Sequence, residues 1–169
     1  MGKTTLSRHL AGMLGVPHIE LARLVKEKGL YKGYDDERSS YIVDVDAARR
    51  VLGDMLTCKE IVDTHVVACI PPGKARLVVV LRLDPLVLKE RLEKRGYSQD
   101  KVRENVEAEV LGVVLADAVE HFGAGRVKEV DLTGLTVEEA LSRVVEALSG
   151  GDFPPGRVDW LEKYWHLLR

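Results

Sequence analysis

The apolar run at residues 77–83, Leu-Val-Val-Val-Leu-Arg-Leu, sets the first limit on the fold. A nearly continuous run of β-branched residues and leucines is typical of a strand that is covered on both faces. Asp84 and Pro85 follow directly, and they predict a helix that is capped by Asp84 and has Pro85 at its first position. A buried strand that leads straight into a helix indicates a parallel α/β arrangement.

The rest of the chain repeats this alternation of strands and helices. Further strands are predicted at 16–19, 61–66 and 127–132. Further helices are predicted at 2–14, 20–28, 46–56, 99–120, 137–148 and 158–168. Thr136 and Glu139 form a capping-box pattern. The polar segment 31–41 is expected to be a loop, with or without short helical turns, and 149–156 a linker. The sequence therefore predicts an α/β protein with a parallel sheet.

Length and charge limit the class of protein. The chain has 169 residues, which suggests one domain that buries its core without disulfides. Its formal net charge of -2 argues against a strongly basic nucleic-acid coat. No apolar run reaches the roughly 18 residues of a membrane span, and no charged leader precedes an apolar core at the N-terminus. We therefore expect a cytoplasmic protein that does not associate with membranes.

The numbers of cysteine and amide residues indicate the redox environment and the working temperature of the protein. Cys58 and Cys69 are too few for a disulfide framework or a cysteine-rich zinc site, and their surroundings are mostly apolar. They are expected to be reduced thiols at or near the interior. The chain has a single Asn, Asn105, and a single Gln, Gln99, among many charged residues. Depletion of these thermolabile amides is typical of hyperthermophile proteins.

The N-terminal residues Gly2-Lys3-Thr4-Thr5 match the end of a P-loop, whose full pattern is G-x-x-x-x-G-K-[ST]. In such a loop, backbone N–H groups converge on phosphate oxygens at the start of a helix. The Lys reaches the β- and γ-phosphates, and the hydroxyl group after it holds Mg²⁺. Because the first half of the pattern is missing, Gly2 and Lys3 taken alone also fit a frayed chain end. The amphipathic helix that starts after Thr4 favours the P-loop.

A second phosphate-site element is expected where the strand at 61–66 ends. Asp63 has the position of a carboxylate that reaches Mg²⁺, directly or through water, from the carboxyl end of a strand beside a P-loop. His65 follows two residues later on the same side of the strand, where it is expected to orient a water molecule or contact a phosphate. The alternative is an Asp that caps a turn and a His that is partly buried.

Arg91 and Arg95 are four residues apart and therefore lie on one face of the helix that Gly96 ends. Two guanidinium groups at a phosphate site suit the neutralisation of charge during phosphoryl transfer. The alternative is an exposed face on which the arginines pair with Glu90, Glu93 and other acids.

Taken together, these segments resemble one family, the small adenylate-kinase-like P-loop ATPases of the adenylate kinase isoenzyme 6 type, of which the chain looks like an archaeal member. The resemblance extends from Gly2 to about Leu148. It is carried by Gly2-Lys3-Thr4-Thr5-Leu6, Gly29-Leu30-Tyr31-Lys32-Gly33-Tyr34-Asp35, Val62-Asp63-Thr64-His65 and the run from Val80 to Tyr97, with Asn105 and Glu109. It implies a P-loop NTPase fold of nucleoside monophosphate kinase type, with a parallel sheet of strand order 2-3-1-4-5 and helices on both faces.

The resemblance and the motifs together assign roles. The expected catalytic residues are Lys3, Asp63, His65, Arg91 and Arg95. The expected ATP-binding residues are Gly2, Lys3, Thr4, Thr5, Arg95 and Leu135, and the expected Mg²⁺ ligands are Thr4 and Asp63. Residues 20–43 match a monophosphate-binding segment, 94–104 a short lid, and 133–135 the place where related kinases contact adenine by backbone. The domain then covers 1–148, and 149–169 form a linker and an aromatic helix.

The family implies ATP and Mg²⁺, with AMP as phosphate acceptor in the reaction ATP + AMP = 2 ADP, and also ATP hydrolysis. It further implies a role in small-ribosomal-subunit maturation and rRNA processing, with ribosomal protein uS11 as partner and indirect contact with rRNA. Three functions stay open: an adenylate kinase, an assembly ATPase in which His65 positions water, and a non-catalytic binding module. A small-metabolite kinase of the same fold is a fourth.

The chain departs from the family pattern in three places. The opening strand and the first P-loop glycines are missing. Because family members commonly carry Val where Met1 stands, we expect a misplaced start and a longer native N-terminus. Residues 66–70 replace the Gly, acidic and aromatic residues of eukaryotic members. The tail 151–169 lies beyond the shared core, and its aromatic helix is expected either to pack on the domain or to contact a partner.

Overall fold

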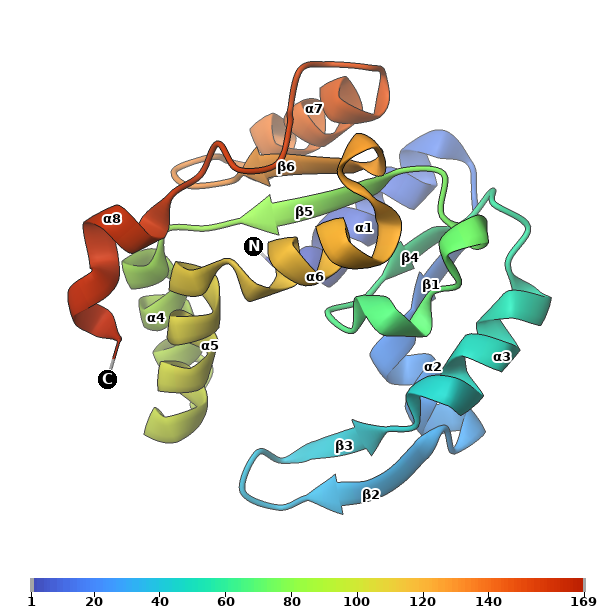
Figure 1. The fold of residues 1–169 in the computed structure, drawn as a ribbon, viewed down its shortest axis with the longest axis horizontal. Helices are drawn as coiled ribbons and strands as arrows, with labels where there is room; N and C mark the ends of the chain where they lie inside the picture. The colour runs from blue at the N-terminus through green and yellow to red at the C-terminus, as the bar shows by residue number, and fades with distance from the viewer. Residues whose placement is uncertain (1, 169) are drawn as a thin grey trace. The chain divides into compact units, whose positions relative to one another are not determined.

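The computed structural model describes residues 2–168, which fall into two compact units, Met1–Arg76 and Leu77–Arg169. Each unit contains a parallel pair of strands with helices packed against it (Figure 1). The predicted α/β class with parallel strands is therefore confirmed.

The first unit is built on the parallel pair β1 (His18–Glu20) and β4 (Ile61–Asp63). The helix α1 (Lys3–Leu14) packs against both strands and buries Leu6, Leu10 and Ala11, which lie on one face of the helix. The remaining elements of this unit are α2 (Leu21–Lys28), α3 (Val45–Met55) and the 3-10 helices η1 (Val67–Cys69) and η2 (Pro72–Lys74). Cys69 is buried and Cys58 half-buried, and both thiols are free.

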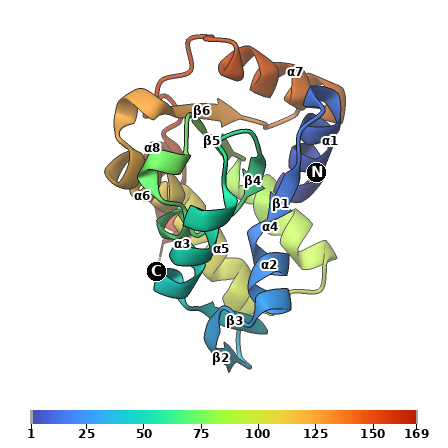
Figure 2. The same cartoon turned by 90° about the vertical axis from the view of Figure 1, so that its right-hand side faces the viewer.

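The prediction of a loop at residues 31–41 is wrong. The segment forms an antiparallel hairpin of β2 (Tyr31–Asp35) and β3 (Ser40–Val43), which extends beyond α2 and α3 (Figures 1 and 2). Its strands are mostly polar, so they lack the apolar alternation on which the prediction depended. Cross-strand aromatic packing stabilises the hairpin instead, because the ring centroid of Tyr41 lies 4.5 Å from that of Tyr31 and 5.1 Å from that of Tyr34.

The second unit is built on the parallel pair β5 (Val78–Arg82) and β6 (Val127–Asp131), paired in register from Val78–Val127 to Arg82–Asp131. The helices α6 (Val113–Phe122) and α7 (Val137–Leu148) lie on opposite sides of this pair (Figures 1 and 2). The capping box predicted from Thr136 and Glu139 is present at the start of α7. A short helix, η3 (Ala124–Arg126), leads into β6.

The helix predicted at 99–120 is in fact two helices, α5 (Gln99–Leu111) and α6, which meet at Gly112. Gly112 has a left-handed backbone with φ of 64°, which ends α5. The guanidinium of Arg82 lies against this glycine, at 3.6 Å from the place where a Cβ atom would stand. The helical period continues across the break, so the sequence pattern alone did not reveal it. The preceding helix α4 (Pro85–Lys94) begins as predicted, with Asp84 Oδ1 accepting the N–H of Leu86.

The C-terminal helix is shorter than predicted. It comprises α8 (Trp160–Tyr164) and the 3-10 turn η4 (Trp165–Leu167). Tyr164 is buried in a cluster with Leu92 of α4 and three valines of α5, whose members are Val102, Val106 and Val110. Of the two alternatives for the tail, packing on the body of the protein is therefore the one that the structure shows.

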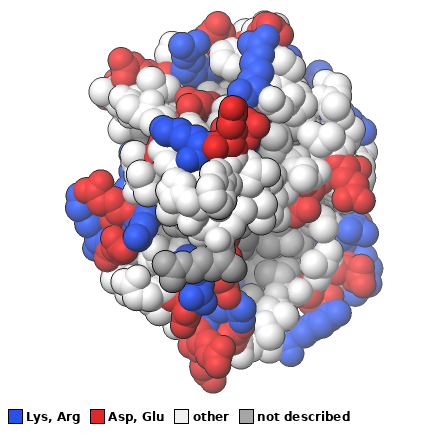
Figure 3. Space-filling view, turned by 60° about the vertical axis from the view of Figure 1, so that its left-hand side comes forward, with Lys and Arg blue, Asp and Glu red and all other residues white. Residues whose placement is uncertain are grey.

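Among residues 2–168, β1–β4 and β5–β6 form two separate two-stranded parallel sheets, so the expected order 2-3-1-4-5 within one sheet stays a prediction. None of the helices in this range has the length and apolar character needed to cross a bilayer. On the face drawn in Figure 3, Lys and Arg side chains alternate with Asp and Glu and form no extended basic area.

Candidate functional site

A cavity of about 350 Å³ lies in the first unit, a volume at the lower end of the range for small-molecule sites. The start of α1, the carboxyl ends of β1 and β4, the first turns of α2, and the hairpin all contribute to its wall. The lining residues are Lys3, Thr4, Glu20, Leu21, Ala22, Val25, Ser39, Ser40, Tyr41, Val43, Asp63, Thr64, His65 and Val66. Four residues predicted from the sequence, Lys3, Thr4, Asp63 and His65, are thus brought together at one cavity.

Lys3 and Asp63 form an ion pair in this cavity. Asp63 is the last residue of β4 and its side chain is fully buried, while Lys3 is the first residue of α1 and its side chain is 41% exposed. The Lys3 ammonium donates to Asp63 Oδ1. Burial lowers the pKa of Lys3, and the nearby Glu20 carboxylate opposes that shift. The pair thus places a positive and a negative group side by side where a helix begins and a strand ends.

His18 also faces Asp63, and sequence reasoning missed it. The parallel register places His18 two residues before Glu20 on β1, and its Nε2 atom lies 3.9 Å from Asp63 Oδ2. Burial is the main cause that lowers the pKa of His18; Arg8 and Lys3 lower it further, and Glu20 opposes the shift. A single His on a three-residue strand carries no spacing signal, so only the strand pairing reveals its position.

The residues present fit an Mg²⁺–nucleotide complex. Asp63 Oδ2 is buried and has no hydrogen-bond partner in the structure, and Thr4 lines the same cavity. One carboxylate and one hydroxyl suit Mg²⁺, which keeps most of its ligands as water and substrate phosphates. Among residues 2–168 no group of three or more His, Cys, Asp and Glu side chains is arranged to hold a metal, so an all-protein cage is not built there.

His65 lines the cavity as expected, but it does not lie in the strand, where side-chain alternation was predicted to place it on the same side as Asp63. β4 ends at Asp63, and the chain turns at once, because Thr64 Oγ1 accepts the N–H of Val66. This turn, rather than a continued strand, brings His65 to the cavity wall, where its side chain is exposed.

The other P-loop residues lie at the start of α1. Gly2 is the N-cap, with extended backbone and no side-chain cap, and its carbonyl accepts the N–H of Leu6. Thr5 is exposed and is not part of the cavity wall. The N–H groups of the first helical turn have no acceptor within the helix, so this end of α1 suits a phosphate.

The hairpin contributes Ser39, Ser40 and Tyr41 to the cavity. None of these was singled out from the sequence, although all three fall in the segment 20–43 that was expected to bind a monophosphate. The missed hairpin explains this, because a polar loop gives no reason to choose one side chain over another.

The remaining predicted residues belong to the second unit. Arg91 lies in the last turn of α4, half-buried, and Arg95 is the exposed C-cap of that helix, so they do share the predicted helical spacing. Leu135 follows β6 in a turn, where its N–H donates to the carbonyl of Leu132. Their roles in binding stay predictions.

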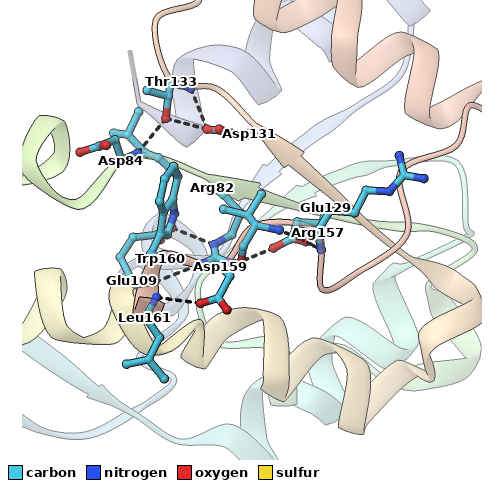
Figure 4. Close-up of polar contacts among 12 residues, drawn as sticks. Arg82, Asp84, Glu109, Glu129, Asp131, Thr133, Arg157, Asp159, Trp160 and Leu161 are labelled. Carbon is cyan, nitrogen blue, oxygen red and sulfur yellow. Dashed lines mark hydrogen bonds and ion pairs between the residues drawn. The ribbon is translucent and has the colours of Figure 1, made fainter. Parts of the chain in front are cut away.

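A buried charge network in the second unit was not foreseen (Figure 4). Arg82 is 3% exposed and pairs with Glu109 through Nε at 2.7 Å and with Glu129 through Nη1 at 2.5 Å. The second oxygen of Glu129 accepts the backbone N–H groups of Gly156 and Arg157, each at 2.8 Å. The carboxylate of Glu109 also accepts the indole N–H of Trp160. This network fastens the C-terminal segment to β5 and β6.

Comparison with known proteins supplies the family. A profile described as "AAA domain" matches residues 1–112. The chain is 37% identical over 171 residues to the "Putative adenylate kinase" of Methanocaldococcus jannaschii, which covers 99% of this chain and 92% of that protein. It is 38% identical over 170 residues to the protein of the same name from Thermococcus kodakarensis, with 99% and 92% covered. The chain therefore belongs to the AAA-domain family that includes these archaeal proteins.

Proposed function

We propose that the protein is a nucleotide kinase that transfers the γ-phosphate of ATP to AMP and yields two ADP. One observation carries the proposal: a single cavity joins the start of α1 at Lys3 and Thr4, the buried carboxylate of Asp63, and the hairpin of the monophosphate-like segment. The names of the archaeal relatives support the same activity.

In the proposed mechanism, side chains of this protein bind and orient the two nucleotides and neutralise the charge of their phosphates. An oxygen of the AMP phosphate would attack the γ-phosphorus of ATP in line, the bond from that phosphorus to the β-phosphate oxygen would break, and one ADP would leave while the other forms. Lys3 leaves Asp63 for the phosphate oxygens, where its ammonium offsets their charge. Thr4 and the Asp63 carboxylate would hold Mg²⁺, which would offset negative charge on the phosphates. The family resemblance supports ATP contacts by Arg91, Arg95 and the loop at Leu135 of the second unit.

The direct test is ADP formation from ATP and AMP with Mg²⁺. The proposal predicts two ADP for each ATP consumed, a rate that rises and saturates with AMP, and little turnover when AMP is omitted. A chain that is extended at its N-terminus by the first half of the P-loop pattern is measured in parallel, because the glycines of that pattern let backbone N–H groups converge on phosphate oxygens. Lack of ADP formation by both proteins contradicts the kinase and leaves the non-catalytic binding module.

Tyr41 is expected to contact the base of the acceptor. It lines the cavity and is held by Tyr31, so its ring offers a fixed stacking surface. Stacking on an aromatic ring contributes about 1–3 kcal/mol per base, so Tyr41→Ala should raise the KM for AMP about tenfold. The KM for ATP should not change. Ile42→Ala is the control, since Ile42 is 52% exposed on the other side of β3. A similar rise in both variants contradicts the assignment.

A second candidate function is an ATPase of small-ribosomal-subunit biogenesis. We propose it because His65 shares the cavity with Asp63, where an exposed imidazole is able to orient a water molecule. The resemblance to the adenylate kinase isoenzyme 6 type supports ribosomal protein uS11 as the partner, with indirect contact to rRNA. Phosphate release that does not require AMP and changes when uS11 is added supports this function, whereas strict dependence on AMP opposes it.

His65→Ala separates the two activities. If His65 positions the attacking water, the variant should lose about 10²-fold in ATP hydrolysis, the lower end of what a positioned acid–base group contributes. The Kd for ATP should change little, and AMP phosphorylation should change less than hydrolysis. Phosphate release and equilibrium ATP binding are the measurements. Equal losses in binding and hydrolysis contradict a water-positioning role.

A further inference from the structure

The carboxyl ends of β5 and β6 are joined by a chain of polar contacts that begins at the C-terminal helix. The two strands are parallel and in register up to Arg82 and Asp131, so the segments that follow them leave the same edge. Ligands of open α/β sheets bind outside this edge. Asp84 follows β5 and Thr133 follows β6, and the N–H of Asp84 donates to Thr133 Oγ1 at 2.8 Å (Figure 4).

Thr133 is in turn fixed from the side of β6. Its hydroxyl donates to Asp131 Oδ1 at 2.6 Å and its backbone N–H donates to the same oxygen at 2.9 Å. Gly134 then adopts a left-handed backbone with φ of 74°, and the N–H of Leu135 closes the turn on the carbonyl of Leu132. The backbone conformation of the loop 133–135 therefore depends on where Asp84 holds Thr133.

Asp84 is itself held by the C-terminal helix. Its Oδ2 atom accepts the hydroxyl of Tyr164 at 2.5 Å and the ammonium of Lys163 at 3.3 Å, while Oδ1 caps α4. Burial by itself raises the pKa of the Asp84 carboxyl, but hydrogen bonds led by that of Tyr164 outweigh burial, and the pKa is lowered. The Asp84 carboxylate thus stays ionised at neutral pH and accepts hydrogen bonds from the side chains of Tyr164 and Lys163 and from the N–H of Leu86.

We propose that Tyr164 is a positioning residue for the donor nucleotide: through Asp84 and Thr133 it sets the conformation of the loop 133–135 that receives the base of ATP. This inference rests on the proposed function, in which the loop at Leu135 contacts ATP, and on the family resemblance, which places adenine there. It gives α8 a role beyond the burial of apolar surface. The Tyr164 ring packs in the cluster with Leu92, while its hydroxyl donates to Asp84, which follows the carboxyl end of β5.

Tyr164→Phe tests the inference because it keeps the ring and removes only the hydroxyl. Because a hydrogen bond to a charged group is worth a factor of about ten or more, we take about tenfold as the expected effect. We expect the Kd for Mg²⁺–ATP, measured by calorimetry without AMP, to rise by that factor. The KM for ATP should rise equally, the KM for AMP should not change, and the preference for ATP over GTP should narrow.

Thr133→Val tests the same connection from its other end. It should produce the same split between the KM values for ATP and AMP, and the double variant should be no worse than the more affected single variant, because both act in one chain of contacts. Trp165→Phe is the control, since Trp165 is 68% exposed on the neighbouring turn, and its ATP affinity should equal that of the parent.

The outcomes separate the inference from the function on which it rests. The inference is overturned if Tyr164→Phe and Thr133→Val keep the parental ATP affinity and the parental preference for ATP over GTP while their melting temperature falls. The contacts of α8 would then contribute to stability alone. If the parent protein forms ADP but the two variants show no split between the KM values for ATP and AMP, the proposed function stands and only the inference is lost. A parent protein that neither binds ATP nor forms ADP overturns both.

Discussion

Replacement of Lys3 by Ala is expected to abolish phosphoryl transfer. Lys3 is the first residue of α1 and carries the cationic side chain that the cavity wall places beside Asp63. Loss of one preorganised group that offsets developing charge lowers kcat about 10²–10³-fold, and we expect a loss at or beyond the upper end. Coupled measurement of ADP formation at saturating ATP and AMP provides the value.

The control for this variant is Lys59→Ala. Lys59 is an exposed lysine of the same unit, between α3 and β4 and outside the cavity wall. It carries the same change in net charge, so its activity should match that of the parent. Thermal unfolding of both variants shows whether Lys3→Ala merely unfolds the first unit. A folded Lys3→Ala protein with more than a tenth of the parental kcat contradicts the role of Lys3.

The buried strands and their helices were predictable because burial leaves a pattern in the sequence. Residues 77–83 are apolar and β-branched since both faces of β5 are covered, and Asp84 with Pro85 marks the helix start by its capping chemistry. The hairpin at 31–43 has no such pattern. Its stability comes from tyrosines on opposite strands, and such pairing across strands is invisible before the register is known.

The candidate site was predictable only in part. Lys3, Thr4 and Asp63 belong to motifs whose spacing reflects phosphate and Mg²⁺ chemistry, and the fold brings them to one cavity. His18 has no motif, and it reaches Asp63 only through the parallel register of two three-residue strands. The break at Gly112 was missed for a similar reason, because the side chain that packs on it, Arg82, is 30 residues away in sequence.

The second large effect is expected from Arg82→Ala. Arg82 is the cation of a buried network whose two anions are Glu109 and Glu129, and both depend on it for neutralisation. Removing one partner of a buried ionic network costs about 3–5 kcal/mol, since the remaining charges stay out of water. For a chain of this size each kcal/mol shifts the melting temperature by about 2–4 °C, so we expect a fall of about 10 °C.

The pH dependence gives this prediction a sharper form. Burial raises the pKa of Glu109, and Arg82 provides the largest opposing effect, so removing Arg82 raises that pKa further. A carboxyl whose pKa is higher in the folded than in the unfolded state binds more protons when folded, and stability then rises as the pH falls. The deficit of Arg82→Ala relative to the parent should therefore shrink between pH 7 and pH 5.

Arg157→Ala is the matched control for Arg82→Ala. The guanidinium of Arg157 is mostly exposed and pairs with the exposed Asp152, while its backbone N–H still donates to Glu129. An exposed pair contributes little, so the melting temperature should hardly move at either pH. Equal melting temperatures for Arg82→Ala and Arg157→Ala would show that the buried network does not stabilise the second unit. A deficit that grows toward pH 5 would show that uncompensated carboxylates are not its cause.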